Sequence, residues 1–290
     1  MTTLIDGKAV AAEIREEIKK DVEALTARGV RPGLAVVLVG EDPASQVYVR
    51  NKQKACEEMG IASFGHFLSA EATETELLDL VDLLNADPKV HGILVQLPLP
   101  KHLDEKKVVN ALSPAKDVDG LHPASVGKLL IGERTFVPCT PQGCCELLMR
   151  SGNDPAGKHA VIVGRSNLVG KPLAAILMQK ARGANATVTV CHSGTRDIAA
   201  YTRQADILVT AMGSPGFIQA DMVRDGVVVI DVGTTRVADA SKKSGFRLAG
   251  DVNFDAVAPK ASAITPVPGG VGPMTITMLM RNTVQAASSL

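Results

Sequence analysis

The stretch VIVGRSNLVGKP, residues 161–172, decides how the fold of this 290-residue chain is read. An apolar run ends at Gly164, a short polar turn follows, and Gly170 and Pro172 begin a predicted helix. Strand, glycine turn and helix in this order are typical of the first βα unit of a dinucleotide-binding sheet. Ser166 replaces the second glycine of the usual G-x-G-x-x-G pattern, so the stretch is either a modified phosphate-binding turn or an ordinary turn.

This turn can attract phosphate without the full set of glycines. Backbone N–H groups at the start of a helix have no partner within the helix, and the local dipole favours an anion there. Arg165 adds a positive charge, and Ser166 adds a hydroxyl donor. Gly170 would let the helix pack close to the strand, and Pro172 is suited to a first helical turn because no N–H is needed there.

The end of the next predicted strand indicates which nucleotide the turn would bind. A site for NAD carries an acidic residue at this point, which binds the ribose 2′-hydroxyl group. The segment CHSGTR, residues 191–196, has no carboxylate. Its His192, Ser193 and Arg196 instead form, with Arg165, a donor-rich corner that suits a 2′-phosphate group. The sequence therefore favours NADP over NAD as the cofactor.

Apolar runs and helical patterns alternate on both sides of this turn. In the C-terminal half we expect strands at 160–164, 186–193, 207–213 and 227–233, separated by helices at 171–181, 197–205 and 218–225. In the N-terminal half we expect strands at 33–40, 62–69 and 90–100, with helices at 8–25, 44–59 and 73–87. Thr73 and Glu76 form a predicted capping box. Such alternation predicts an α/β fold with two domains and mostly parallel sheets.

Two segments rich in proline and glycine interrupt the alternation. Residues 112–143 have little periodicity and are expected to connect the two domains. Within them, Thr140 and Pro141 suit the N-cap and the first position of a helix that runs to about residue 151. The loop PVPGGVGPMT, residues 266–275, precedes a last helix, and it is either a backbone surface for a flat ligand or a simple entry turn.

The composition indicates a small-molecule partner. Lys and Arg balance Asp and Glu at 31 each, so no net charge attracts nucleic acid or a membrane surface. No apolar run approaches the roughly 20 residues of a membrane helix, and the N-terminus lacks signal-peptide features, so we expect a cytoplasmic protein. The five cysteines form no C-x-x-C pair, which predicts reduced packing residues and neither a disulfide framework nor a zinc site.

Tyr48 and Lys52 are four residues apart and share one face of the helix predicted at 44–59. The rest of that face is apolar. Burial disfavours the charged ammonium group and lowers its pKa, which would make Lys52 a usable proton carrier near neutral pH. The alternative is a lysine whose stem packs on the protein while its amine stays in water.

Two further polar features follow the buried strand at 90–100. Gln96 comes directly after an apolar run, where its amide could bind a ligand, Lys52 or a nearby backbone group. The segment KDVDG places Asp117 and Asp119 in a loop. It lacks the third acidic position and the distal glutamate of a calcium loop, so we predict no metal site.

Six motifs together resemble a known family. YVRNK (48–52), VQLPLP (95–100), KDVDG (116–120), GRSNLVGKP (164–172), IDVG (230–233) and PVPGGVGPMT (266–275) occur in the order and approximate separations of one enzyme family. This is the family of bifunctional methylenetetrahydrofolate dehydrogenase/methenyltetrahydrofolate cyclohydrolases of the FolD type. The likeness covers essentially the whole chain.

The resemblance implies two consecutive reactions on tetrahydrofolate one-carbon derivatives. Methylene-tetrahydrofolate is oxidised to methenyl-tetrahydrofolate by hydride transfer to NADP, and the product is hydrolysed to 10-formyl-tetrahydrofolate. It also implies a homodimer, a role in purine biosynthesis and two α/β domains that flank a folate-binding cleft. The folate-binding catalytic domain would be residues 1–140 with the C-terminal helix at about 271–290, and the Rossmann-like NADP-binding domain would be residues 141–270.

The resemblance also assigns roles to individual residues. Lys52 would be the central catalytic residue, with Tyr48 positioning the folate, Gln96 supporting Lys52 and Asp119 holding the pterin. Further substrate contacts are expected at Leu97, Pro268, Gly269 and Gly270. Cofactor contacts are expected at Gly164, Arg165, Ser166, Ser193, Arg196 and Thr234.

The chain departs from the family pattern at two places. Thr234 and Thr235 follow Gly233 where many relatives have isoleucine and asparagine, and the segment 179–185 is longer than usual, which we expect to lengthen the preceding helix. Two other functions stay open at this point. One is a monofunctional dehydrogenase that uses NAD or NADP, and the other is a non-catalytic nucleotide- or folate-binding protein.

Overall fold

The computed structural model describes residues 2–242 and 245–289, which form two compact units. We call the first the Lys52 unit; it consists of Glu13–Cys139 and the residues from Ile276 onward. We call the second the Gly164 unit; it consists of the residues up to Ala12 and of Thr140–Thr275. Within the described residues, no helix is both long enough and apolar enough to cross a membrane.

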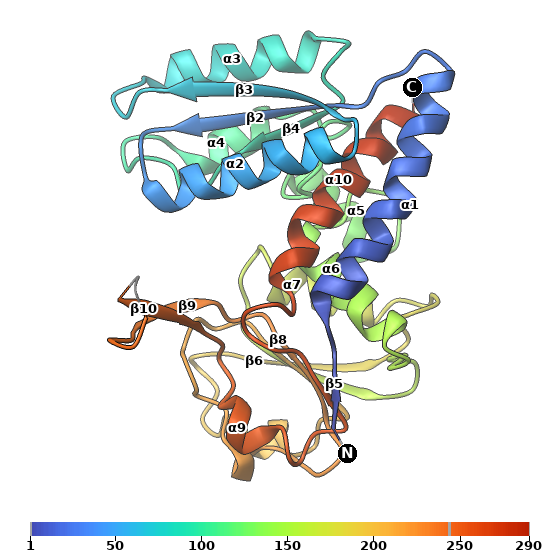
Figure 1. Cartoon of the computed structure of the whole chain (residues 1–290), viewed down its shortest axis with the longest axis vertical. Helices are drawn as coiled ribbons and strands as arrows, with labels where there is room; N and C mark the ends of the chain where they lie inside the picture. The colour runs from blue at the N-terminus through green and yellow to red at the C-terminus, as the bar shows by residue number, and fades with distance from the viewer. Residues whose placement is uncertain (1, 243–244, 290) are drawn as a thin grey trace. The chain divides into compact units, whose positions relative to one another are not determined.

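The Lys52 unit is built on a three-stranded parallel sheet. Its strands are β2 (Gly33–Val39), β3 (Ala62–Leu68) and β4 (Gly92–Val95), in the order β3-β2-β4. Every residue of β2 is buried, because α2 covers one face of the sheet and α3 the other (Figure 1). The helices that contribute to this unit are α1 (Gly7–Ala27), α2 (Pro43–Glu58), α3 (Glu74–Ala86), α4 (Glu105–Ala111), α5 (Pro123–Ile131) and α10 (Gly272–Ser288).

The predicted strands and long helices of this unit are confirmed. The capping box is also confirmed, since the Thr73 hydroxyl accepts a hydrogen bond from the N–H of Glu76 and the Glu76 carboxylate accepts one from the N–H of Thr73. The boundary between the two units falls within 112–143, at Cys139–Thr140, but this segment is not a loop throughout, because α5 lies within it. Pro123 at its start and left-handed Gly132 at its end are helix signals that the general richness in proline and glycine concealed.

The Gly164 unit contains a six-stranded sheet in which all neighbours are parallel. The strand order is β1 (Thr3–Leu4), β11 (Ala263–Ile264), β8 (Val228–Asp231), β7 (Ile207–Thr210), β5 (His159–Val163) and β6 (Thr187–Cys191). An antiparallel hairpin of β9 (Thr235–Ala238) and β10 (Phe246–Ala249) is separate from it. The predicted α/β class with mostly parallel sheets is therefore confirmed.

Short helices connect the strands of this unit. They are α6 (Cys139–Arg150), α7 (Gly170–Leu177), α8 (Ile198–Thr202), the 3₁₀ turn η1 (Ala220–Met222) and α9 (Phe254–Val257). From β5 the chain passes to β6 on one side and then to β7 on the other. This reversal creates a topological switch point at the carboxyl ends of β5 and β7, where ligands of open α/β sheets bind.

Three local predictions in this unit were wrong. The helix expected at 218–225 is only the 3₁₀ turn η1. The segment 179–185 does not lengthen α7, which ends at Leu177, because the N–H of Ala186 bonds to the Leu177 carbonyl oxygen and returns the chain at once. Thr140 does not cap α6, since that helix begins at Cys139; its hydroxyl lies 3.0 Å from the hydroxyl of Thr275 instead.

Candidate active site

Lys52 lies on α2 with its side chain buried. The helix starts cleanly, because Asp42 accepts a hydrogen bond from the N–H of Ser45 and Pro43 occupies the first turn. Lys52 is only 8% exposed, whereas Tyr48, one turn earlier on the same helix, is 53% exposed. The alternative in which the amine of Lys52 stays in water is therefore wrong. A buried amine next to an exposed aromatic ring can act on a ligand that stacks on that ring.

The Lys52 amine has a defined partner at the end of β4. Its Nζ donates to Oε1 of Gln96 at 2.9 Å, as the sequence suggested it could. The Gln96 amide nitrogen in turn donates to the carbonyl oxygen of Leu97 at 2.7 Å, and the backbone N–H of Gln96 donates to Val37 on β2. These bonds fix which atom of the Gln96 amide faces Lys52, so the amine is held in one orientation.

Burial lowers the pKa of Lys52, and the nearby Asp119 and Cys139 oppose this effect by favouring the charged ammonium group. Burial dominates because removing an ammonium group from water is costly unless an opposite charge is close. The amine is thus easier to deprotonate than an ordinary lysine. It can lose and regain a proton nearer neutral pH, as a general base or acid requires.

The two aspartates of KDVDG have different surroundings. Asp117 is 1% exposed and accepts hydrogen bonds from the N–H groups of Leu121 and His122 and from the hydroxyl of Ser125. Burial nevertheless raises the pKa of Asp117. Asp117 therefore organises the start of α5. Asp119 is only half-buried and acts electrostatically on Lys52, so it is the carboxylate available to a ligand.

Two residues beside Asp119 had no signal in the sequence. Cys139 is buried, its thiol donates to the carbonyl oxygen of Val118 at 3.6 Å, and burial, together with the nearby Asp119, raises the pKa of the thiol well above the usual value. Asn282 of α10 donates to the carbonyl oxygens of Val118 at 2.8 Å and Val137 at 3.0 Å. Because one residue is a cysteine among five and the other lies near the far end of the chain, no local pattern links them to Asp119.

The glycine turn after β5 has the close packing that the sequence predicted. Gly164 has a φ of 137°, and a Cβ there would collide with the carbonyl oxygen of Ala211. A Cβ on Gly170 would collide with the carbonyl oxygen of Gly164. Both positions require glycine for this reason. The start of α7 thus lies directly against the end of β5, which leaves Arg165 and Ser166 exposed between them.

The donor-rich corner forms at the carboxyl ends of β5 and β6. Arg165 Nη1 lies 3.4 Å from Nε2 of His192, and Ser193 and Arg196 are exposed in the turn that follows. The next carboxylate in the chain, Asp197, accepts from the N–H of Ala200 at the start of α8 and caps that helix. Two guanidinium groups, an imidazole and a hydroxyl therefore lie at the strand ends where a 2′-phosphate group needs donors, so these residues fit NADP.

The remaining predicted residues lie on loops of the Gly164 unit. Thr234 is exposed after β8. Pro268 is exposed, Gly269 has a φ of 109°, and the N–H of Gly270 donates to the Pro266 carbonyl oxygen at 2.8 Å. Lys52, Tyr48, Gln96, Leu97 and Asp119 come together in the Lys52 unit, and the other predicted residues belong to the Gly164 unit.

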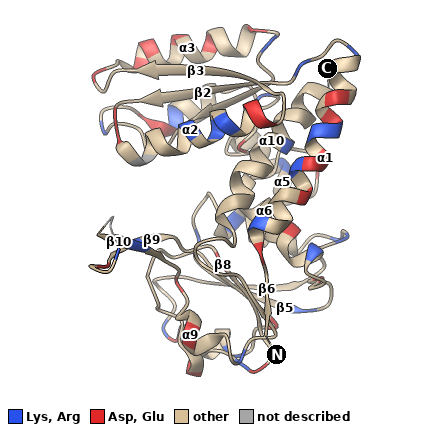
Figure 2. Ribbon diagram, viewed as in Figure 1, with Lys and Arg blue, Asp and Glu red and all other residues tan. Residues whose placement is uncertain are grey.

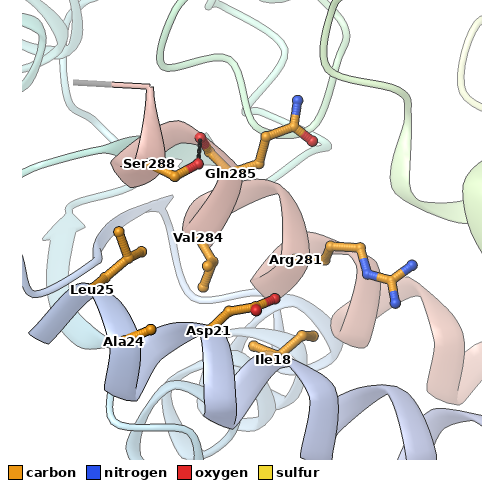
Figure 3. A pocket seen from close by; sticks show the side chains of 8 residues that line it. All are labelled: Ile18, Asp21, Ala24, Leu25, Arg281, Val284, Gln285 and Ser288. Atoms are coloured by element: carbon orange, nitrogen blue, oxygen red, sulfur yellow. Dashed lines mark hydrogen bonds between the residues drawn. The ribbon is translucent and has the colours of Figure 1, made fainter.

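A groove of the Lys52 unit contains none of these residues. It has a volume of about 510 Å³ and lies between α1 and α10 (Figure 3). Its lining is formed by Ile18, Asp21, Ala24, Leu25, Arg281, Val284, Gln285 and Ser288. Charges of both signs alternate along α1 beside it (Figure 2). The buried amine of Lys52 is a better guide to the chemistry, because burial lowers its pKa and Gln96 holds it in place.

Comparison with known proteins gives a consistent result across the chain. Residues 5–119 match the family model for the catalytic domain of tetrahydrofolate dehydrogenase/cyclohydrolase, and residues 138–290 match the model for its NAD(P)-binding domain. The bifunctional protein FolD of Moorella thermoacetica is 60% identical over 284 residues, which cover 98% of each chain.

Solved structures agree with these matches. The bifunctional enzyme FolD, a methylenetetrahydrofolate dehydrogenase/cyclohydrolase from Campylobacter jejuni, is 49% identical with a TM-score of 0.94, and the match covers 100% of this chain and 99% of that one. The FolD of Trypanosoma brucei, complexed with NADP cofactor and an inhibitor, is 44% identical with a TM-score of 0.93 and covers 99% and 98% of the two chains.

Proposed function

The chain belongs to the tetrahydrofolate dehydrogenase/cyclohydrolase family, and on that premise we propose its full activity. It is an NADP-dependent bifunctional enzyme of one-carbon metabolism. It oxidises 5,10-methylene-tetrahydrofolate to 5,10-methenyl-tetrahydrofolate and then hydrolyses this product to 10-formyl-tetrahydrofolate. The observation that carries this function is the buried Lys52 amine, held by Gln96 and placed one helical turn from the exposed Tyr48 ring.

Lys52 is the acid and base of the hydrolysis. Water must lose a proton as it attacks the methenyl carbon, and the ring nitrogen that leaves must gain one. An amine whose pKa is lowered by burial can perform both transfers near neutral pH. The methenyl group is a cation, so a permanently charged ammonium group beside it would repel it. A deprotonated Lys52 therefore serves both reactions.

The oxidation depends on alignment more than on a strong base. NADP, when bound, accepts the hydride that leaves the methylene carbon. Arg165, Ser166, Ser193 and Arg196 hold its phosphate groups by charge and hydrogen bonds, and Gly164 and Thr234 contact it through the loops after β5 and β8. Fixing donor and acceptor in one geometry supplies most of the acceleration of such a step.

The remaining residues of the Lys52 unit, together with one loop of the Gly164 unit, orient the folate. Tyr48 offers its exposed ring to the flat pterin, and the half-buried Asp119 accepts hydrogen bonds from the pterin edge. Gln96 keeps the Lys52 amine aimed, and Leu97 follows at the same strand end. Pro268, Gly269 and Gly270 form a loop with little side-chain bulk that admits the folate ring close to the backbone.

The biological setting follows from the same reading. Residues 1–140 with the helix at about 271–290 serve as the catalytic domain, which binds the folate, and residues 141–270 serve as the NADP-binding domain. The enzyme acts as a cytoplasmic homodimer, and its product supplies one-carbon units for purine biosynthesis. Its balanced charge gives nucleic acid no reason to bind. Fractionation of its cells tests the location, and sedimentation of the purified chain tests the dimer.

The two alternatives from the sequence are less well supported. A monofunctional dehydrogenase would need Lys52 only for positioning, but relatives at up to 60% identity over nearly the whole chain are bifunctional FolD proteins. A non-catalytic binding protein would gain nothing from burying an amine beside an amide and a carboxylate.

The substitution Lys52→Met tests all three functions. For the wild type and for Lys52→Met, we assay oxidation and hydrolysis separately, with NADP and with NAD. Folate binding and thermal unfolding are measured for the same two proteins. The proposed function requires hydrolysis to fall by about 10²–10⁴-fold while the protein stays folded. A wild type that accumulates methenyl product would support the monofunctional enzyme, and a wild type without turnover would support the binding protein. If Lys52→Met hydrolyses the substrate as fast as the wild type, Lys52 is not the general acid and base of the hydrolysis.

A further inference from the structure

Two buried carboxylates of the Gly164 unit have no part in the function described so far. Asp231 belongs to the IDVG motif at the end of β8, and Asp251 follows β10. Asp231 is 3% exposed and Asp251 is fully buried. Their partners in the described part of the chain are backbone N–H groups and one threonine hydroxyl rather than lysine or arginine side chains. Burying a carboxylate is costly in free energy unless hydrogen bonds or opposite charges offset the loss of water. The hydrogen bonds of these two side chains therefore need an explanation.

Asp251 holds the loop that follows β7. Its Oδ2 accepts from the N–H groups of Met212 at 2.7 Å and Gly213 at 3.3 Å, and its Oδ1 accepts from the N–H of Ser214 at 2.7 Å. Gly213 and Ser214 are not buried, yet their N–H groups are directed inward to this carboxylate. One side chain therefore fixes the backbone of three consecutive loop residues.

Asp231 fixes Asp251 and the loop that follows β8. Its Oδ1 accepts from the hydroxyl of Thr210 at 2.9 Å, the N–H of Gly233 at 3.0 Å and the N–H of Asp251 at 3.0 Å. Its Oδ2 accepts from the N–H of Val252 at 2.9 Å. Burial raises the pKa of Asp231 to about 6, so the side chain is still mainly an ionised acceptor at neutral pH.

The positions of these two loops link Asp231 and Asp251 to the cofactor site. The β7 loop begins at Ala211, whose carbonyl oxygen lies against Gly164 at the phosphate turn. It thus lies at the switch point between β5 and β7, where the sheet binds its ligand. The β8 loop contains Thr234, and the backbone of Gly233 packs directly on the carboxylate of Asp251. Both loops border the cofactor site, and both are held from behind by the same two side chains.

We propose that Asp251, held by Asp231, is a positioning residue for NADP: it keeps the loop Met212–Ser214 and the neighbouring Gly233 in the shape that the cofactor binds. The inference rests on the proposed function, because it requires NADP to occupy this edge of the sheet. Neither carboxylate contacts the cofactor. Each acts by fixing backbone that would otherwise have to be ordered at a cost when the cofactor binds.

Asp251→Asn is the direct test. An asparagine has one acceptor oxygen and one NH₂ group, so either Ser214 or the Met212 and Gly213 pair would face a donor instead of an acceptor. We expect the dissociation constant of NADPH, followed by its fluorescence on the full-length chain, to rise about tenfold or more, equivalent to at least about 1.4 kcal/mol. Amide hydrogen exchange at 212–214 should become faster. The KM for the folate substrate should stay unchanged.

Thr210→Val provides a milder second variant that preserves side-chain volume. It removes one hydroxyl donor from Asp231, so we expect about a two- to fivefold weaker affinity for NADPH. Asp206→Asn is the matched control, because Asp206 binds the N–H of His159 and the Arg224 side chain at the opposite end of the same strands. It should leave NADPH affinity unchanged even if it lowers the melting temperature.

The outcomes separate this inference from the proposed function. If the wild type binds NADPH and both variants bind it equally well, the positioning role is wrong and the proposed function stands. If Asp251→Asn does not fold, Thr210→Val decides. If the control weakens binding as much as the variants do, general destabilisation explains the effect and the inference fails. If the wild type does not bind NADPH, the proposed function fails first.

Discussion

Lys52 and Arg165 are both cations, yet the fold treats them in opposite ways. Lys52 is buried, bonded to Gln96, and has its pKa lowered by burial. Arg165 is exposed on a turn, 3.4 Å from an imidazole nitrogen. Because a guanidinium group stays charged under all ordinary conditions, Arg165 can only attract an anion, whereas Lys52 can exchange a proton. The contrast shows that burial and residue type together decide whether a cation can exchange a proton or can only attract an anion.

We expect the largest effect from a permanently charged side chain at position 52. Lys52→Arg introduces a guanidinium group, which carries a positive charge and cannot be deprotonated in a protein. We expect hydrolysis of methenyl-tetrahydrofolate to fall by about 10²–10⁴-fold, as much as in Lys52→Met. Initial rates of methenyl loss, followed by ultraviolet absorption, measure this. In the wild type the rate should rise with pH through the lowered pKa of Lys52, because only the neutral amine can accept a proton.

A Lys52→Arg chain that hydrolyses the substrate well would mean that charge alone matters at this position. In that case the two cations would act alike, and the distinction between the units would be lost. Thermal unfolding of both variants controls for the larger size of the arginine side chain, since overpacking a core is itself destabilising.

The sequence predicted the two regions unequally, for physical reasons. Gly164 and Gly170 are needed for close backbone approach over a few residues, so a local pattern announces them. The Lys52 site is assembled from α2, the end of β4 and the loop between α4 and α5 that carries Asp119, and the burial of Lys52 follows only from tertiary packing. Spacing placed Tyr48 and Lys52 on one helix face, but it could not choose between a buried and a solvated amine.

The predictions that failed most often were those that relied on proline, glycine and other local signals for where a helix begins and ends. The helix α5 was hidden because proline and glycine at its two ends looked like loop composition. The helix expected at 218–225 did not form, because Gln219, Ala220 and Met222 close only a 3₁₀ turn before β8 begins. Cys139 and Asn282 had no sequence signal at all, because both act through neighbours that are distant in the chain.

The glycine turn after β5, from Gly164 to Gly170, can be disrupted through its backbone. Gly170→Ala places a Cβ against the carbonyl oxygen of Gly164, which is backbone and cannot rotate away. We expect a loss of more than about 2 kcal/mol in the free energy of unfolding, measured by urea titration. Gly127→Ala is the matched control, since apart from the neighbouring backbone of α5 no atom of the described residues lies within 4 Å of a Cβ there. Alanine favours a helix, so that variant should be more stable by about 0.5–1 kcal/mol.

A Gly170→Ala chain as stable as the wild type would show that α7 can shift away from β5. The close approach would then have no structural need, and the modified glycine pattern at 164–170 would lose its physical explanation. Because the Lys52 unit has a separate core, its hydrogen exchange should change little in this variant.

Removing the exposed cation should affect one cofactor only. Arg165→Ala takes one guanidinium group from the corner formed with His192, Ser193 and Arg196. We expect the affinity for NADP to fall about tenfold, since charge-assisted bonds to phosphate are the strong ones. The affinity for NAD, which has no 2′-phosphate group, should change much less. Arg224→Ala, at the opposite end of the strands, should leave both affinities alone. Equal losses for NAD and NADP would place the 2′-phosphate elsewhere.

Ionic strength should produce the smallest effect and the clearest separation of the two cations. Salt screens exposed charges, whose fields extend over about 10 Å at 0.1 M, but it reaches buried groups poorly. Raising salt from about 0.05 to 0.5 M should therefore weaken NADP binding by roughly two- to fivefold. The acid limb of the pH–rate profile, which is the pH range where the hydrolysis rate rises as Lys52 loses its proton, should stay at the same pH. A limb that moves with salt would mean that the Lys52 amine meets solvent during turnover. Desolvation could then not be what lowers its pKa, and proton transfer would need another explanation.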